Sequence, residues 1–239
     1  MSNEIFQNNG KYTFSFNEEA VVAERSLMRN VYGWMTLALA VTGLMAYYTA
    51  NAAWALSIIA SPAIWVLLIA EIVLVFVLSA RIDKMSFKTA AIMFALYSLL
   101  NGMTLSVIFL AYSISTIASA FFVTAGTFGG MALVGSFIKK DLSGMGKFLL
   151  FALIGLIIAS IVNIFIMNST MDFIISIVGV LLFAGLTAYD SQKIKQMLQT
   201  YGTEVNETTQ KIALMGALSL YLDFINLFLY ILRLFGRRD

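Results

Sequence analysis

The sequence contains no cysteine and no histidine, and it has a single proline in 239 residues. Without cysteine it has no disulfide and no thiol nucleophile, and without histidine it lacks the imidazole of most zinc sites and of serine–histidine catalysis. Charge is also scarce, because only 12% of the residues are Asp, Glu, Lys or Arg. Several classes of enzyme are thereby excluded, and no enzymatic activity is expected. The basic residues form short clusters and no continuous stripe, so nucleic acid is not an expected partner.

Apolar residues make up 60% of the chain, whereas soluble domains are about half apolar and about a quarter charged. A lipid bilayer is therefore the expected surrounding of most of the surface. Seven apolar stretches are long enough to cross a hydrocarbon core of about 30 Å, which takes roughly 20 helical residues. They cover residues 31–50, 62–80, 90–112, 115–138, 148–167, 173–190 and 212–235. The sequence predicts an all-α membrane protein, a bundle of seven transmembrane helices.

Residues 1–30 are polar and lack the apolar core of a cleavable signal peptide. We expect them to form a soluble N-terminal tail, followed by one transmembrane domain over residues 31–236. The third and fourth stretches are divided only by residues 112–116, which predicts a tight helical hairpin. Gly126 and Gly130 form a small-xxx-small pattern in the fourth stretch, and this pattern is typical of close helix packing.

Lysine and arginine indicate the orientation, because they concentrate in cytoplasmic loops. Basic residues precede the first stretch and fill every second loop after it: Arg25, Arg29, Arg81, Lys84, Lys88, Lys139, Lys140, Lys147, Lys193, Lys195 and Lys211. The alternate loops, at 51–61, 112–116 and 168–172, contain neither Lys nor Arg. This asymmetry predicts a cytoplasmic N-terminus. The seventh crossing that we expect places the C-terminal arginines outside, against the rule, unless the last segment is re-entrant.

Four of the ionisable residues inside the apolar stretches or at their ends are informative, because a charge at mid-bilayer costs at least about 2.5–3.5 kcal/mol. Glu71 is in the middle of the second stretch and Arg81 at its end, while Asp190 ends the sixth. For Arg81 and Asp190, a place at the membrane interface is an alternative interpretation. Asp223, at the centre of the seventh stretch, is too deep to reach water and needs a partner, a proton or a hydrated cavity. A functional role is the first hypothesis for such a group.

The depths of Asp190 and Asp223 in the membrane, as estimated from the sequence, do not by themselves place the two side chains in contact. A helix rises about 1.5 Å per residue, which places Asp223 roughly 17 Å in from Lys211 and Asp190 only a few ångströms from the cytoplasmic edge. Spacing alone therefore leaves their contact open.

Four strings of the sequence carry a family resemblance: VYGWM (Val31–Met35), NGMTLS (Asn101–Ser106), LTAYDSQKI (Leu186–Ile194) and ALSLYLDFINLFLYILRLFG (Ala217–Gly236). They resemble the bacterial branch of the Bax inhibitor family, also called the transmembrane BAX inhibitor motif family. The resemblance spans roughly residues 20–236. It implies a seven-helix fold whose last helix is enclosed by the others, and a pH-sensitive calcium leak across the bacterial inner membrane.

The resemblance also implies a site. In the family, an aspartate of helix six and one of helix seven form a hydrogen-bonded pair near the cytoplasmic side, and an arginine of helix two can join them. The matching residues are Asp190, Asp223 and Arg81, as pH sensor and gate. Glu71 resembles an acidic residue that some relatives carry in the same helix, and it is expected on the ion path. A long polar loop, Ser191–Gln210, departs from the family pattern.

The chemistry of an aspartate pair suits a switch. Two carboxylates within hydrogen-bond range cannot both ionise cheaply, so they share a proton. A shared proton ties the two helices together, whereas two charges, or capture by Arg81, separate them. Calcium takes oxygen ligands, so Asp190 and Asp223 are expected to hold it transiently during passage. No resident cofactor is expected, and the expected partners are lipid, Ca²⁺ and H⁺.

Three alternatives to a pH-sensitive calcium leak channel stay open. A non-transporting regulator that binds other membrane proteins has helix faces that look like lipid-facing ones. A proton-coupled transporter also uses intramembrane acids, although neither inverted repeats nor broken helices are evident. An intramembrane aspartyl protease uses two aspartates, and Tyr189-Asp190 satisfies its first motif. Its second motif, Gly-x-Gly-Asp, is not matched, because the bulky Tyr221 and Leu222 precede Asp223.

Overall fold

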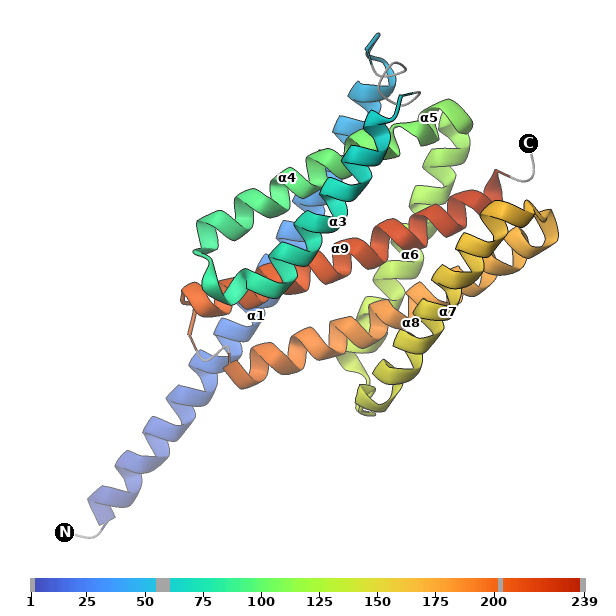
Figure 1. Ribbon diagram of the computed structural model, residues 1–239. Coiled ribbons are helices and arrows are strands. Elements are labelled where there is room, and N and C mark those ends of the chain that lie inside the picture. The colour runs from blue at the N-terminus through green and yellow to red at the C-terminus, as the bar shows by residue number, and fades with distance from the viewer. Residues whose placement is uncertain (1–2, 55–60, 202–203, 237–239) are drawn as a thin grey trace.

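The computed structural model describes residues 3–54, 61–201 and 204–236, with side chains from residue 21 onward. Its elements are α1 (Asn3–Ala50), α3 (Ala63–Arg81), the 3-10 turn η1 (Ile82–Lys84), α4 (Phe87–Leu105), α5 (Val107–Ala111), α6 (Ile114–Phe137), α7 (Ser143–Ile166), α8 (Ser169–Tyr201) and α9 (Glu207–Phe235). Seven segments are long and apolar enough to cross a membrane, the first being Val21–Ala50 and the third α4 with α5 (Figure 1). The predicted all-α bundle is confirmed.

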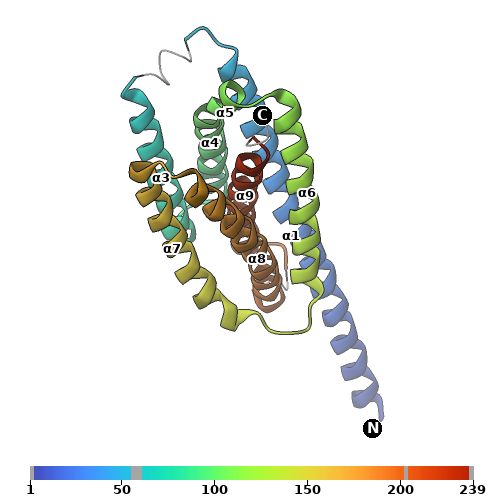
Figure 2. The same ribbon diagram turned by 90° about the vertical axis from the view of Figure 1, so that its right-hand side faces the viewer.

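The helices run back and forth between two ends of the bundle (Figure 2). The connections α3–α4, α6–α7 and α8–α9 lie at one end, and because Lys and Arg gather in these connections and in the helix ends next to them we call it the basic end. The expected hairpin between the third and fourth crossings is confirmed at the opposite end. There α6 begins three residues after α5, and the Ser113 hydroxyl caps it by accepting a 3.2 Å hydrogen bond from the amide of Thr116.

The predicted polar loop Ser191–Gln210 is wrong. The helix α8 continues to Tyr201, and α9 begins already at Glu207. Although this stretch is rich in polar residues, one face of it is buried. Ser191, Ile194 and Leu198 recur at helical spacing and are 0%, 5% and 0% exposed. Hydropathy falls after Asp190, but the amphipathic pattern does not end there.

The helix α1 begins at Asn3, so most of the expected tail, residues 1–30, is helical and continuous with the first crossing. Buried side chains at Ala23, Leu27 and Val31 repeat every four residues, which extends the packed face eight residues before the predicted start at residue 31. The location of the tail in water stays a prediction.

The last helix, α9, packs against α8, α1, α6 and α4, and runs between α1 and α8 (Figures 1 and 2). Its most buried side chains include Leu214, Leu220, Tyr221 and Leu227, each 0% exposed. In contrast, α3 packs mainly on α4, and α7 mainly on α8. Enclosure of the last helix by all the others therefore stays a prediction.

Contacts at its two ends show that α9 traverses the bundle. At the basic end, the Lys211 ammonium donates to the carbonyl oxygens of Asp83 and Met85, at 3.1 and 3.2 Å. At the opposite end, Gly236 lies so close to the ring of Tyr112 in the α5–α6 connection that a Cβ atom would overlap it. The last segment therefore runs the whole length of the bundle, as the expected seventh crossing requires.

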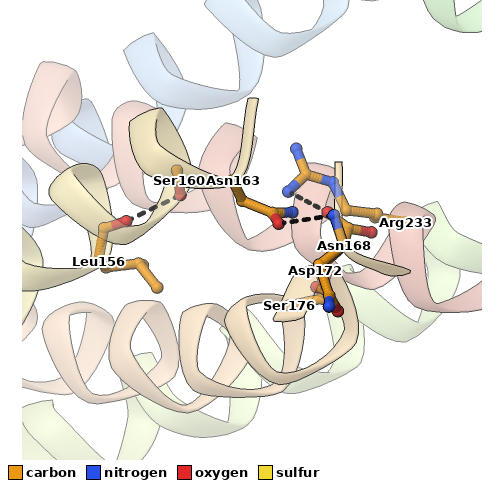
Figure 3. Close-up of polar contacts among 7 residues, drawn as sticks. All are labelled: Leu156, Ser160, Asn163, Asn168, Asp172, Ser176 and Arg233. Carbon is orange, nitrogen blue, oxygen red and sulfur yellow. Dashed lines mark hydrogen bonds and ion pairs between the residues drawn. The ribbon is translucent and has the colours of Figure 1, made fainter. Parts of the chain in front are cut away.

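Figure 3 shows the polar contacts around the far end of α9. Arg233 lies 3.4 Å from the carboxylate of Asp172, in the first turn of α8. The side chain of Asn168 caps the same turn by accepting a 2.9 Å hydrogen bond from the amide of Met171. A half-exposed ion pair contributes only about 0–1 kcal/mol. The pair places a negative charge beside Arg233, which lies at the end of the bundle where the loops contain no Lys or Arg.

The expected close packing at Gly126 and Gly130 is wrong within the chain. Both residues are exposed, and no atom lies within 4 Å of the position that a Cβ atom would take. The close approach of α6 occurs at Gly135, where a Cβ atom would overlap the backbone of Ala188 in α8. This contact positions the middle of α8, which carries one of the candidate residues.

Candidate functional site

The antiparallel helices α8 and α9 carry the two aspartates, and two close contacts define their register. Gly216 of α9 lies against Ile194 of α8, and Gly179 of α8 lies against the ring of Tyr230 of α9. In this register Asp223 is level with residues 186–187, about one helical turn or roughly 5 Å along the axis from Asp190. The expected difference in depth between the aspartates is therefore wrong, because α8 extends far beyond Asp190.

Asp223 is 5% exposed, and its Oδ2 atom has no hydrogen-bond partner among the described residues. Asp190 is half-buried. The described part of the chain shows no hydrogen bond between the two carboxyl groups, so the hydrogen-bonded pair of the family stays a prediction. A buried carboxyl oxygen without a partner is costly, which makes Asp223 the most unusual polar group of α9.

A cavity of about 210 Å³ separates α8 from α9 next to Asp190. Its polar lining consists of Asp190, Lys193 and Ser219, and the remaining lining residues are Ile194, Met197, Ile212, Met215 and Gly216. Lys193 is exposed, so the cavity reaches the surface toward the basic end. Ser219 lies one turn before Asp223 on α9, so the cavity approaches the second aspartate as well.

Arg81 is not brought to the aspartates. It ends α3 at the basic end, its side chain is exposed, and it makes no ion pair with any residue that the structure describes. The helix that carries it packs on α4 and η1. Its role as a partner of Asp190 and Asp223 stays a prediction.

Glu71 is 7% exposed and lies in a polar contact inside the bundle. Its Oε2 accepts a 3.0 Å hydrogen bond from the Asn101 amide, and its Oε1 accepts a 2.8 Å bond from the Thr104 hydroxyl. Both donors come from α4. Glu71 is thus partnered by protein groups, and its place on an ion path stays a prediction.

The contact continues beyond Asn101 to two further helices. The Tyr221 hydroxyl of α9 donates to Asn101 Oδ1 at 3.0 Å, and it lies 2.7 Å from the Thr42 hydroxyl of α1. Thr42 donates in turn to the carbonyl oxygen of Ser98 at 2.9 Å. The sequence did not indicate Asn101 and Thr104 as partners of Glu71, nor Tyr221 and Thr42 as the residues that continue the contact beyond Asn101. The only sequence signal for these residues is that they are polar side chains inside apolar stretches. Their spacing does not indicate that they contact one another.

A second cavity, of about 370 Å³, lies among α1, α5, α6 and α9. Apart from Thr42 its lining is apolar, with residues such as Gly43, Phe121, Phe224 and Phe228. None of its lining residues has an ionisable side chain.

The link between α6 and α7 holds an acidic residue outside the membrane-spanning helices. The exposed carboxylate of Asp141 accepts hydrogen bonds from the Ser143 hydroxyl at 2.6 Å and from the Ser143 amide at 2.9 Å. These bonds hold the pKa of Asp141 below its usual value.

The described residues contain no group of three or more His, Cys, Asp or Glu side chains that could hold a metal ion. Asp190 and Asp223 alone provide fewer oxygens than the six to eight that Ca²⁺ takes in a stable site.

Comparisons with known proteins agree with the architecture. The family model described as inhibitor of apoptosis-promoting Bax1 matches residues 24–239. Inner membrane protein YbhL of Escherichia coli (strain K12) is 46% identical over 216 residues, which are 90% of this chain and 92% of that protein. A protein of Deinococcus radiodurans is 43% identical over 215 residues, or 90% of this chain and 92% of its own length. A membrane protein of Streptococcus pyogenes serotype M1 is 44% identical over 171 residues, 72% of this chain and 73% of that one.

The matches extend along almost the whole membrane bundle and include both helices with the aspartates. Seven helices that are long and apolar enough to cross a membrane, a family model over residues 24–239 and relatives above 40% identity all point the same way. This chain is an integral membrane protein that belongs to the Bax inhibitor family.

Proposed function

We propose that this protein is a pH-sensitive cation leak channel, with calcium as the permeant ion and with Asp190 and Asp223 as its proton sensor. Its location is the bacterial inner membrane, as the name of the Escherichia coli relative states for that protein. The basic end faces the cytoplasm, in keeping with the distribution of Lys and Arg.

One observation carries the proposal: a buried carboxyl oxygen of Asp223 has no partner, and Asp190 lies one turn away beside a cavity of about 210 Å³. Two ionised carboxylates so close together repel each other, so the charge of the pair is linked to the contact between α8 and α9. Any change of pH that alters this charge therefore biases the packing of the two helices.

The cavity beside Asp190 provides the first part of a path from the basic end. A leak requires weak binding, because an ion that is held tightly does not leave. Two carboxylates meet this requirement, since they attract a cation without completing its coordination shell. Glu71 takes part only when its contacts with Asn101 and Thr104 open.

The test is calcium-dye flux into proteoliposomes at about pH 5 to 8, the range in which a perturbed carboxyl group titrates. Asp190→Asn and Asp223→Asn should each remove most of the pH dependence of the flux. The double variant should be scarcely worse than either single variant, because the two groups act as one unit. Arg81→Ala should shift the midpoint of the pH profile, because it removes a positive charge that favours an ionised aspartate.

The matched control is Asp141→Asn, which removes a carboxylate at the same end of the bundle. Because the pKa of Asp141 lies below its usual value, this group stays ionised over the whole range. Its replacement should leave the pH profile unchanged. Unchanged profiles in both Asp190→Asn and Asp223→Asn contradict the sensor. Absence of calcium flux through the parent protein contradicts the channel and favours a regulator that binds other membrane proteins.

A further inference from the structure

Glu71 stands at one end of a hydrogen-bond chain that joins α3, α4, α9 and α1. The chain has five contacts of hydrogen-bond length, each of which needs one hydrogen between its two atoms. They are Thr42 Oγ1 with Ser98 O (2.9 Å), Thr42 Oγ1 with Tyr221 OH (2.7 Å), Tyr221 OH with Asn101 Oδ1 (3.0 Å), Asn101 Nδ2 with Glu71 Oε2 (3.0 Å) and Thr104 Oγ1 with Glu71 Oε1 (2.8 Å). The Thr104 hydroxyl also lies 3.0 Å from the carbonyl oxygen of Asn101 on its own helix, a local contact that is not counted in the chain.

The chain has too few hydrogens when Glu71 is ionised. The hydroxyls of Thr42, Tyr221 and Thr104 supply one each, and the Asn101 amide nitrogen faces only one of its two neighbours. Four hydrogens cannot fill five contacts. The shortage falls on Thr42 and Tyr221, whose two hydroxyl hydrogens must serve three contacts. At 2.7 Å, the usual length of an O–H···O bond, their mutual contact also requires a hydrogen.

A proton on Glu71 removes the shortage when the Asn101 amide turns by 180°, which exchanges its oxygen and nitrogen in place. Glu71 Oε2 then donates to the Asn101 oxygen, and the Asn101 nitrogen donates to Tyr221. Tyr221 donates to Thr42, and Thr42 donates to the carbonyl of Ser98. A proton placed instead on Oε1 and shared with Thr104 leaves the three contacts of Thr42 and Tyr221 with two hydrogens.

We propose that Glu71 and Asn101 form a proton-binding site, separate from the aspartates of α8 and α9, in which the amide orientation couples protonation of Glu71 to Thr42 on α1. In the protonated state all five contacts hold a hydrogen. In the ionised state the amide faces Glu71 with its nitrogen, and one contact of Thr42 or Tyr221 is lost. Because such coupling is reciprocal, loss of the distant contacts must weaken proton binding at Glu71.

The surroundings of Glu71 contain no competing charge in the described residues. The titratable groups that face it are the phenols of Tyr97 on α4 and Tyr221 on α9, and phenols are neutral at physiological pH. The other neighbour of α3 is η1, whose Asp83 and Lys84 are exposed at the basic end. The proton on Glu71 therefore depends on the hydrogen-bond chain and on burial.

The test follows the proton by infrared spectroscopy of the protein in bilayers. The C=O stretching band of protonated Glu71 is identified by its loss in Glu71→Gln, and its disappearance is followed as pH rises. Thr42→Val removes two contacts, so the remaining three are filled without a proton. We expect the band of Glu71 to disappear about one pH unit lower in Thr42→Val, which is a tenfold weaker proton affinity.

The chain provides a matched control on the same helix. Thr49 is 2% exposed, close to the 3% of Thr42, but its hydroxyl has no partner in the described structure. Thr49→Val should leave the titration unchanged, as should Tyr97→Phe, which removes a phenol outside the chain. Thr42 does not contact Glu71, so its replacement can change the titration of Glu71 only through the hydrogen-bond chain. Equal titrations for Thr42→Val and the parent protein therefore overturn the coupling. Absence of a Glu71 band at every pH from about 5 to 8 overturns the proton site. The readout is independent of ion flux, so either result leaves the proposed channel untouched.

Discussion

At the scale of single residues, Gly102 allows α1 and α4 to approach each other beside the Glu71 chain. A Cβ atom at Gly102 would lie 2.6 Å from the carbonyl oxygen of Thr42 and 2.7 Å from the Cβ atom of Met45. Backbone cannot yield at such distances without moving a helix, and overpacking typically costs about 1–3 kcal/mol. We expect Gly102→Ala to lower the thermal unfolding temperature of the detergent-solubilised protein.

Gly43 is the control for this prediction, because it lies on the facing helix with no atom within 4 Å of its Cβ position. Gly43→Ala should keep or raise the unfolding temperature, since alanine favours helix by about 1 kcal/mol over glycine. Equal unfolding temperatures of the two variants would show that α1 and α4 separate easily.

Which residues could be found from the sequence depended on their charge. Asp223 and Glu71 were identified because a carboxylate in an apolar stretch is costly wherever the chain folds. Asn101, Tyr221 and Thr42 are uncharged, and such residues occur in helices without any partner. Their contacts join positions as far apart as 179 residues, so only the packing of four helices reveals them.

At the scale of elements, Gln192 ties the extension of α8 to the link between α6 and α7. Its Oε1 accepts a 2.7 Å hydrogen bond from the amide of Leu142, and its Nε2 donates to the carbonyl of Lys140 at 2.9 Å. Hydropathy alone assigned Gln192 to a loop. The helix continues because Ile194 and Leu198 are buried, a pattern that is recognised only when periodicity is weighed separately from mean hydropathy.

Gln192→Ala should leave the Leu142 amide without a partner. A buried unpaired donor costs about 1–3 kcal/mol, so local opening of residues 138–142 should become roughly tenfold or more faster. Hydrogen–deuterium exchange of this segment, measured by mass spectrometry, provides the test. Gln199→Ala is the control, because Gln199 is exposed and its 3.3 Å hydrogen bond goes to Glu24. Faster exchange in both variants would indicate general loosening of α8.

At the scale of the whole molecule, the count and order of the crossings were predictable, because a bilayer imposes a minimum length on every apolar helix. The boundaries were less so. Val21–Ala50 and Ser169–Tyr201 are longer than the apolar runs inside them, since protein contacts continue the helices beyond the hydrocarbon core. Lysine and arginine predict the orientation, and the helical bundle has the same form in either orientation.

Labelling of single cysteines on this cysteine-free chain tests the orientation. Lys84→Cys and Lys147→Cys, both exposed at the basic end, should react with an impermeant maleimide only from the cytoplasmic side. Trp54→Cys, at a position that is 40% exposed at the opposite end, should react only from outside. A cysteine appended to the C-terminus should behave like the one at position 54. Labelling of position 54 from the cytoplasm would reverse the assigned orientation.

The position of α9 has a consequence for biosynthesis. It is the last of the seven crossings to leave the ribosome, yet α1, α4, α6 and α8 all pack against it. Until α9 enters the membrane, Thr42 and Asn101 lack their contact with Tyr221, and the α8 face next to Asp190 is uncovered. The first six helices are therefore incompletely packed until α9 is inserted. A message that is truncated before codon 207 yields a chain without α9, in which α1, α4, α6 and α8 lack the helix that they all contact.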